Sequence, residues 1–287
     1  MNIVNILEEI EKVDGEIYER LNPRRAAMKS LASMGKKISL AAMPLAMGAM
    51  FQKAYGQTTP TAVTDVLNFA LALEYLEFHF YNHGLVAAPG LTLSTSQRAD
   101  ITVIRDHESA HVNLLKGALG SAARAEITYA MTDFTANNTF SDVYSNPLTF
   151  LKVALGFEDT GVRAYKGQAG ALLGNPVLTT ALQIHSVEAR HAAHIRTMLN
   201  AAGATGLKPW ITLGPGNIGN DTGVTAVNAV YDGEQATSQD VKGTTINIAG
   251  IASQVTAAAA AECFDEPLAK GNVVTIANLF LRDGFKL

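Results

Sequence analysis

The sequence predicts an all-α protein whose main part is a four-helix bundle with one long crossover connection. Four segments of about 23 to 27 residues repeat apolar side chains at threes and fours, and capping residues, prolines and glycines mark their ends. The connections within each pair of segments are short, whereas the connection between the pairs is long, which predicts two antiparallel hairpins. With 48% hydrophobic residues among 287, the chain can bury a sizeable core.

Residues 1–56 read as an export signal that precedes the bundle. The pair Arg24 and Arg25 stands before an apolar run of about fourteen residues, shorter than the roughly 20 that span a bilayer. A small-x-small triplet ending at Gly56 follows, as at a signal peptidase site. The arginine pair resembles a twin-arginine signal, which would let the protein fold and take up metal before export. We expect a periplasmic or secreted protein with no membrane span after processing.

The charge distribution argues against nucleic acid as a partner. The whole chain has a formal net charge of −4, and residues 1–56 carry eight basic and six acidic residues, so the remainder is more acidic still. No cluster of lysines and arginines follows Lys53, although such clusters dominate phosphate binding. Cys263 is the single cysteine, which excludes a disulfide within the chain, and we expect it to be a small buried hydrophobe.

The bundle is expected in residues 57–202. Its helices are predicted over about 61–83, from 94 to 117 or 120, over 146–173 and over 175–200. Ser94 and Gln97 have capping-box spacing, and an Asn-Pro pair opens each of the last two helices. The stretch from about 120 to 145 is long enough to run the length of a bundle, which predicts the crossover.

Residues 203–287 are expected to form an appendage that packs on the bundle. Gly-rich turns are followed by Thr/Val/Ile-rich extended pieces such as 244–248, and then by a helical stretch over 251–264 and a last amphipathic segment. We expect Trp210 and Phe264 to be anchors that dock this appendage.

The helices carry a repeated pattern of metal-ligating residue types. The first helix of each predicted hairpin holds a glutamate in an apolar setting, and the second holds a Glu-x-x-His motif, whose two side chains share one helix face. The candidate ligands are Glu74, Glu108, His111, Glu158, Glu188 and His191. Four carboxylates in one core are costly unless cations compensate them, and two divalent ions would cancel their charge. Oxygen and imidazole ligands together suit iron or manganese, with zinc also open.

A second repeat supports this set. Tyr81 follows Glu74 by seven residues, and Tyr165 follows Glu158 by the same interval, so the hairpins look like duplicated halves. The two tyrosines are interpreted as core packing, or as hydrogen-bond donors behind the ligands, or as redox-active phenols.

Several neighbours are alternatives. Glu77 follows Glu74 by three residues and could take its place as a ligand. His194 extends the Glu-x-x-His motif of the fourth helix by a further three residues, although the matching position of the second helix is Leu114. The remaining histidines, including His107, are expected to be ordinary polar groups.

With these motifs the chain resembles the ferritin-like superfamily, and within it the bacterial secreted ferritin-like domain family related to desiccation-related proteins. The matching segments are Asn68 to Glu77, Phe157-Glu158-Asp159, Val187 to His191 and Phe264 to Leu268. The resemblance implies the six residues named above as ligands of two iron or manganese ions, with Glu108 and Glu188 bridging.

The function expected from this resemblance is a di-metal oxidoreductase acting on peroxide, dioxygen or ferrous iron in the cell envelope. The alternative is a non-enzymatic stress-related or desiccation-related envelope protein in which the metal pair is structural. Iron storage would need a multi-subunit cage, which the appendage disfavours, whereas a smaller homo-oligomer stays open. The expected partners are therefore a small-molecule oxidant or a metal ion.

Overall fold

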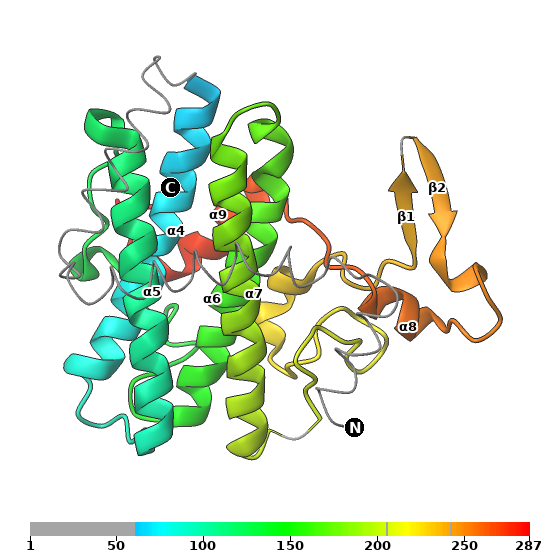
Figure 1. Ribbon diagram of the computed structural model, residues 1–287. Coiled ribbons are helices and arrows are strands. Elements are labelled where there is room, and N and C mark those ends of the chain that lie inside the picture. The colour runs from blue at the N-terminus through cyan, green and yellow to red at the C-terminus, as the bar shows by residue number, and fades with distance from the viewer. Residues whose placement is uncertain (1–60, 205, 242) are drawn as a thin grey trace, which may run out of the picture. The chain divides into compact units, whose positions relative to one another are not determined.

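The computed structural model describes residues 61–204, 206–241 and 243–287. The predicted export signal, residues 1–56, lies outside these described residues. Four long helices in this part of the chain form the predicted bundle (Figure 1): α4 (Thr61–Val86), α5 (Thr95–Leu119), α6 (Pro147–Gln168) and α7 (Val177–Ala201). Helix α4 packs against α5 and α6 against α7, and the two hairpins meet where α4 contacts α6 and α5 contacts α7.

The starts of α5 and α6 follow the predicted capping chemistry, whereas α4 continues past the predicted stop at Gly84 to Val86, and α7 begins after Pro176, which provides no side-chain cap. The Ser94 hydroxyl accepts a hydrogen bond from the Gln97 backbone N–H at 3.2 Å, and the Gln97 side chain accepts one from the Ser94 N–H at 3.0 Å, which completes the capping box of α5. The Asn146 side chain caps α6 in front of Pro147. Helix α6 ends earlier than predicted because its last turn tightens into the 3₁₀ helix η3 (Ala169–Leu172).

The crossover between α5 and α6 runs along α4. It begins with η1 (Gly120–Ala122), where the Asn68 side chain donates a hydrogen bond to the Ala122 carbonyl at 2.9 Å. Near its other end, the Tyr144 hydroxyl donates to the Phe80 carbonyl at 3.3 Å. Twelve helical residues separate the two α4 contacts, a distance of about 18 Å. The crossover therefore returns the chain along the bundle, as the long connection predicted.

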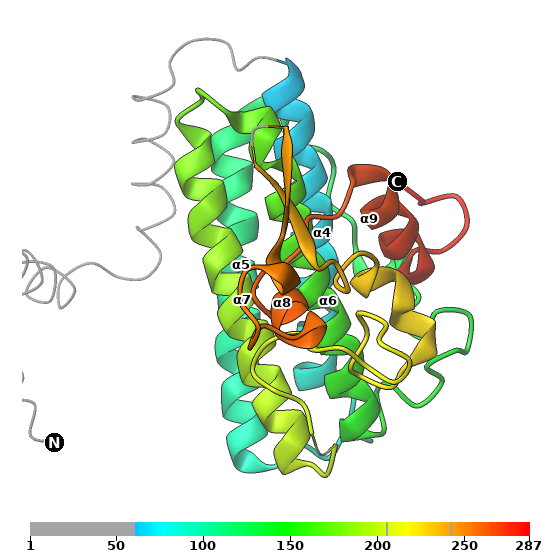
Figure 2. The ribbon, with the colours of Figure 1, turned by 90° about the vertical axis from the view of Figure 1, so that its right-hand side faces the viewer.

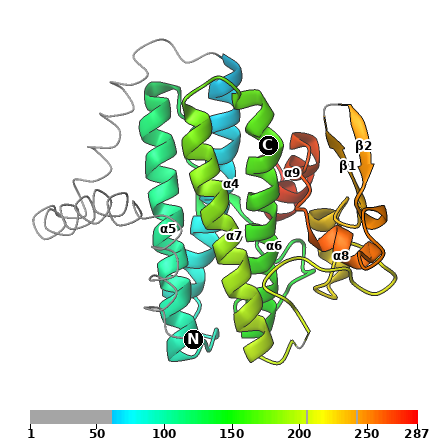
Figure 3. The ribbon, with the colours of Figure 1, turned by 45° about the vertical axis from the view of Figure 1, so that its right-hand side comes forward.

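The C-terminal part forms the appendage, which lies beside α6 (Figures 2 and 3). In order it contains η4 (Thr225–Tyr231), β1 (Ser238–Val241), β2 (Thr244–Asn247), η5 (Ile248–Gly250), α8 (Ala257–Glu262), α9 (Lys270–Ala277) and η6 (Asn278–Phe280). The two strands form an antiparallel hairpin, and η4 and α9 pack against α6. The helix predicted over 251–264 is confined to α8, because the Thr256 side chain caps it by accepting from the Ala259 N–H at 3.1 Å.

The C-terminal end of the described chain also pairs with the crossover. Thr132 and Leu281 form an antiparallel bridge. On either side of it, the Asp133 N–H donates to the Phe280 carbonyl and the Arg282 N–H to the Met131 carbonyl, each at 2.9 Å. Residues from two distant parts of the sequence therefore hold each other beside the bundle.

Two buried arginines attach the appendage to the bundle. Arg163 of α6 is fully buried, donates to the backbone carbonyls of Val230, Asp232 and Glu266, and pairs with Glu234 at 2.8 Å. A guanidinium group offers five donors in a fixed fork, which is why one side chain can hold several turns of the appendage.

Arg196 of α7 makes the second attachment. Its guanidinium contacts Asp221 of the appendage at 2.7 Å and Asp159 of α6 at 2.8 Å, and it is 1% exposed. The Tyr231 hydroxyl donates to the same Asp159 oxygen at 2.7 Å. This network ties α6, α7 and the appendage together through charge-assisted hydrogen bonds.

Three predictions about buried residues are wrong. Trp210 and Phe264, expected to be docking anchors, are 51% and 40% exposed, and the buried contacts that attach the appendage come from the two arginines. Cys263 is exposed at the C-terminal end of α8, where its thiol donates to the Ala259 carbonyl.

Among the described helices, none combines the length and apolar content needed to cross a bilayer.

Candidate metal centre

All six predicted ligands converge in the core of the bundle. Helix α4 supplies Glu74, α5 supplies Glu108 and His111, α6 supplies Glu158, and α7 supplies Glu188 and His191. The four glutamates have no exposed surface, and His191 is 5% exposed. Side chains three residues apart share a helix face, so each Glu-x-x-His motif turns both of its members inward.

The ligand atoms fall into two groups of four. One contains Glu74, Glu108, His111 and Glu188, and the other contains Glu108, Glu158, Glu188 and His191; in each, the donor atoms lie within 4.8 Å of one another. Glu108 and Glu188 belong to both groups. Two neighbouring ion positions that share two carboxylates are the arrangement that bridging ligands require.

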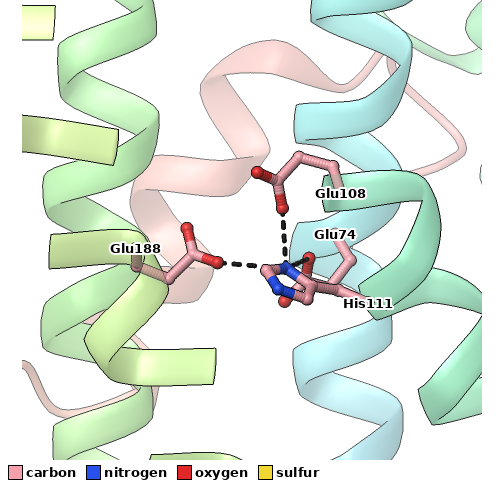
Figure 4. Close-up of side chains that lie close together, drawn as sticks. All are labelled: Glu74, Glu108, His111 and Glu188. Atoms are coloured by element: carbon pink, nitrogen blue, oxygen red, sulfur yellow. Dashed lines mark hydrogen bonds and ion pairs between the residues drawn. The ribbon is translucent and has the colours of Figure 1, made fainter. Parts of the chain in front are cut away.

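The His111 ring shows how tightly the first group converges (Figure 4). Its Nδ1 atom lies 2.9 Å from an oxygen of Glu108, 3.2 Å from one of Glu74 and 3.2 Å from one of Glu188. One ring nitrogen carries at most one proton and therefore cannot serve three carboxylates with separate hydrogen bonds.

The His191 ring faces the second group in the same way. Its Nδ1 atom lies 3.0 Å from an oxygen of Glu158 and 3.0 Å from one of Glu108. Both histidines thus present Nδ1, rather than Nε2, to the carboxylates.

Tyr81 and Tyr165 are hydrogen-bond donors to the candidate ligands. Tyr81 of α4 donates to Glu158 of α6, and Tyr165 of α6 donates to Glu74 of α4 at 2.5 Å. Both phenols are buried. Each hairpin therefore donates a hydrogen bond to the lone glutamate of the other hairpin. This reciprocal pattern is what two duplicated halves related by a local twofold axis would give.

Glu77 is buried beside the cluster, 3% exposed, but it belongs to neither group of four. Its place in the repeat corresponds to Gly161 in the second half, three residues after Glu158. A Cβ atom at Gly161 would lie 3.2 Å from oxygens of both Glu77 and Glu188. Because Gly161 has no side chain, space remains beside the cluster for the carboxylate of Glu77.

The structure corrects two expectations about histidines. His194 does not reach the cluster, because its side chain is 49% exposed and pairs with Asp100 at 3.2 Å. His107, expected to be an ordinary polar group, contacts His191 through a hydrogen bond of 2.9 Å. Its position four residues before His111, on the same face of α5, is the signal that could have marked it.

Burial and the neighbouring charges raise the pKa values of several carboxylates in the cluster. Burial raises the pKa of Glu74 to about 7, against the opposing effect of His111. Burial, and then the charges of Glu108 and Glu158, hold the pKa of Glu188 well above its ordinary value. Burial followed by the charge of Glu188 does the same for Glu77. These groups resist carrying negative charge together unless a cation is near.

The pKa values of His191 and Glu108 shift in the direction that favours their charged forms. Burial disfavours a charged His191, but the carboxylates of Glu158 and Glu108 outweigh it and raise the pKa of His191 to about 11. Burial would raise the pKa of Glu108, yet its close contacts with His111 and His191 lower it to about 2. The cluster therefore attracts positive charge, for which protons and metal ions compete.

The donor set fits a pair of divalent ions. Within the described residues, both buried oxygens of Glu188 and one of Glu108 have no hydrogen-bond partner. Buried carboxylate oxygens without donors are costly, and cations coordinated by oxygen and imidazole would satisfy them. The structure thus contains a buried cluster of carboxylates and histidines that is compatible with a di-metal site.

One comparison with known proteins gives a match, and it covers the four-helix bundle. Residues 62–201, which cover α4 to α7, match the family model described as a ferritin-like domain. Searches of the curated proteins and of the solved structures give no significant match.

Proposed function

We propose that the ferritin-like domain formed by residues 62–201 holds two metal ions, iron or manganese, and acts as an oxidoreductase on peroxide, dioxygen or ferrous iron. The observation that supports this most is the overlap of the two ligand groups in Glu108 and Glu188. A buried pair of redox-active ions linked by carboxylates suits reactions in which two electrons pass to or from a small oxidant.

Each part of the cluster has a separate task in this proposal. Glu74 and His111 would hold one ion, Glu158 and His191 the other, and Glu108 and Glu188 both. When bound, the metal ions would supply one-electron redox steps and Lewis acidity. Hydrogen bonds from Tyr81 and Tyr165 orient the two lone glutamates, and the surrounding core keeps bulk water away from all four carboxylates.

Turnover is the test of the enzymatic part. The protein loaded with Fe²⁺ or Mn²⁺ should contain about two ions per chain and show oxidase, peroxidase, catalase or ferroxidase activity. The variant carrying both Glu108→Ala and His111→Ala should lose the metal and the activity together, because it removes a shared ligand and an imidazole. Two tightly held ions without any of these activities would overturn the enzymatic proposal.

Complete burial of the four glutamates favours the second candidate function, a metal pair that only holds the bundle of a stress-related protein together. In that case, chelation would lower the melting temperature strongly while every assay of turnover stayed at background. The two candidates therefore differ in a single measured quantity, the rate of reaction with the metal pair in place.

We also propose that the protein acts in the bacterial cell envelope. Arg24 and Arg25, followed by an apolar run and a small-x-small triplet, support export through the twin-arginine route. Replacing both arginines with lysine should keep the protein in the cytoplasm, as measured by cell fractionation. Unchanged export of this variant would contradict the twin-arginine proposal.

A further inference from the structure

His191 is engaged through both of its ring nitrogens. Its Nδ1 atom faces Glu108 and Glu158, and its Nε2 atom lies 2.9 Å from Nδ1 of His107. The two rings lie nearly parallel, at 17° with their centroids 5.2 Å apart. His107 is exposed at the surface of α5, so it stands on the outer side of the buried ligand.

His111, the counterpart of His191 in the repeat, has no such neighbour. The residue before each Glu-x-x-His motif is His107 in α5 but Val187 in α7. A valine side chain cannot accept a hydrogen bond. Among the described residues, no hydrogen bond reaches Nε2 of His111, whereas its Nδ1 atom contacts carboxylates as that of His191 does. The two halves of the site therefore differ in the hydrogen bond made by the Nε2 atom of the ligand histidine.

The chemistry of ligation gives this difference a consequence. A histidine that binds a metal through Nδ1 keeps its proton on Nε2, which then needs an acceptor. Nδ1 of His107 is in position to accept it and so would fix the tautomer and ring orientation of His191. Partners of this kind usually contribute about 10- to 100-fold to metal affinity.

We propose that His107 is a positioning residue that makes the two metal positions unequal, so that the ion held by His191 binds more tightly than the ion held by His111. The inference rests on the proposed function, because it requires the cluster to bind metal. A first ion added to the metal-free protein would go to the position formed by Glu108, Glu158, Glu188 and His191.

Titration of the metal-free full chain with Zn²⁺, followed by calorimetry, tests this inference without using activity. The wild type should bind two ions in two resolved steps. His107→Ala should weaken the tighter step by about 10- to 100-fold and leave the weaker step unchanged. His107→Asn should restore most of the loss, because its Oδ1 atom stands where Nδ1 of histidine stands. Val187→Ala, at the equivalent place in α7, serves as the matched control and should change neither step.

Co²⁺ gives a second reading of the same question. With one equivalent added, the visible spectrum of His107→Ala should differ from that of the wild type, because the first ion no longer prefers one position. Two equal Zn²⁺ affinities in the wild type, or an equal shift of both steps in His107→Ala, would overturn the inference and leave the proposed function intact. A wild type that binds no Zn²⁺ would overturn both. Circular dichroism shows whether each variant is folded.

Discussion

Glu188→Gln should abolish binding of the metal pair and leave the metal-free bundle at least as stable as the wild type. Glu188 is wholly buried and belongs to both ligand groups, and neither of its oxygens has a hydrogen-bond partner in the described part of the chain. Glutamine keeps the shape of the side chain and removes its charge, which burial and the neighbouring charges of Glu108 and Glu158 disfavour in the metal-free core. We expect metal affinity to fall by more than about 100-fold. Loss of a residue that only hydrogen-bonds to a ligand usually costs about 10- to 100-fold, and Glu188 is proposed to be a ligand itself.

The gain in stability should grow with pH. Burial raises the pKa of Glu74 from its ordinary 4.5 to about 7, and burial and neighbouring carboxylates also raise that of Glu188. An acid whose pKa is raised by folding contributes stability that is complete below its ordinary pKa and lost as pH rises through the folded value. The metal-free wild type should therefore lose stability between about pH 4.5 and 7 and beyond, and the variant should lose less.

Two measurements check this result: metal content after dialysis, and urea unfolding of the metal-free proteins at about pH 5 and pH 8. Glu126→Gln is the matched control, because Glu126 is an exposed glutamate that belongs to neither ligand group. Retention of two ions by Glu188→Gln, or lower stability than the wild type at the higher pH, would contradict the expectation.

Arg196→Met should destabilise the protein by about 3 to 5 kcal/mol, the usual loss when one partner of a buried ion pair is removed. The methionine side chain fills part of the space but leaves Asp159 and Asp221 without their guanidinium partner. Because these contacts join the appendage to α6 and α7, the appendage should separate before the helices unfold.

Urea unfolding followed by two signals measures this effect. Trp210 is the single tryptophan and lies in the appendage, so its fluorescence reports on that part, while circular dichroism reports mainly on the bundle helices. The two transitions should separate in the variant. Arg190→Met, at an exposed position of α7, is the control and should cost less than about 0.5 kcal/mol. A loss below about 1 kcal/mol for Arg196→Met would show that the network does not hold the appendage.

The parts of the fold that the sequence predicted depend on local chemistry. The capping box at Ser94 and the Asn-Pro pair at Asn146 act within one helical turn, so their residues are adjacent in the sequence. The inward direction of Glu108 and His111 is likewise set by helical spacing. The convergence of four helices on one cluster could be anticipated because the pattern occurs in both hairpins and four lone carboxylates would not share a core.

The parts that could not be predicted depend on the alignment of one helix against another. The contact between His107 and His191 requires a specific offset of α5 against α7, and the exchange of hydrogen bonds by Tyr81 and Tyr165 requires one of α4 against α6. The docking role of Arg163 was hidden for a related reason, since its acceptors are mostly backbone carbonyls, which leave no trace in residue identity.

The pairing of residues 131–133 with residues 280–282 sets an order of events during synthesis. Domains generally begin to fold as the chain emerges from the ribosome, from the N-terminal side onward. Both helical hairpins, with all six candidate ligands, are made well before residue 282, whereas the segment that runs along α4 acquires its pairing partner only afterwards. A nascent chain can thus bring the candidate ligands together before residues 131–133 of the crossover pair with residues 280–282.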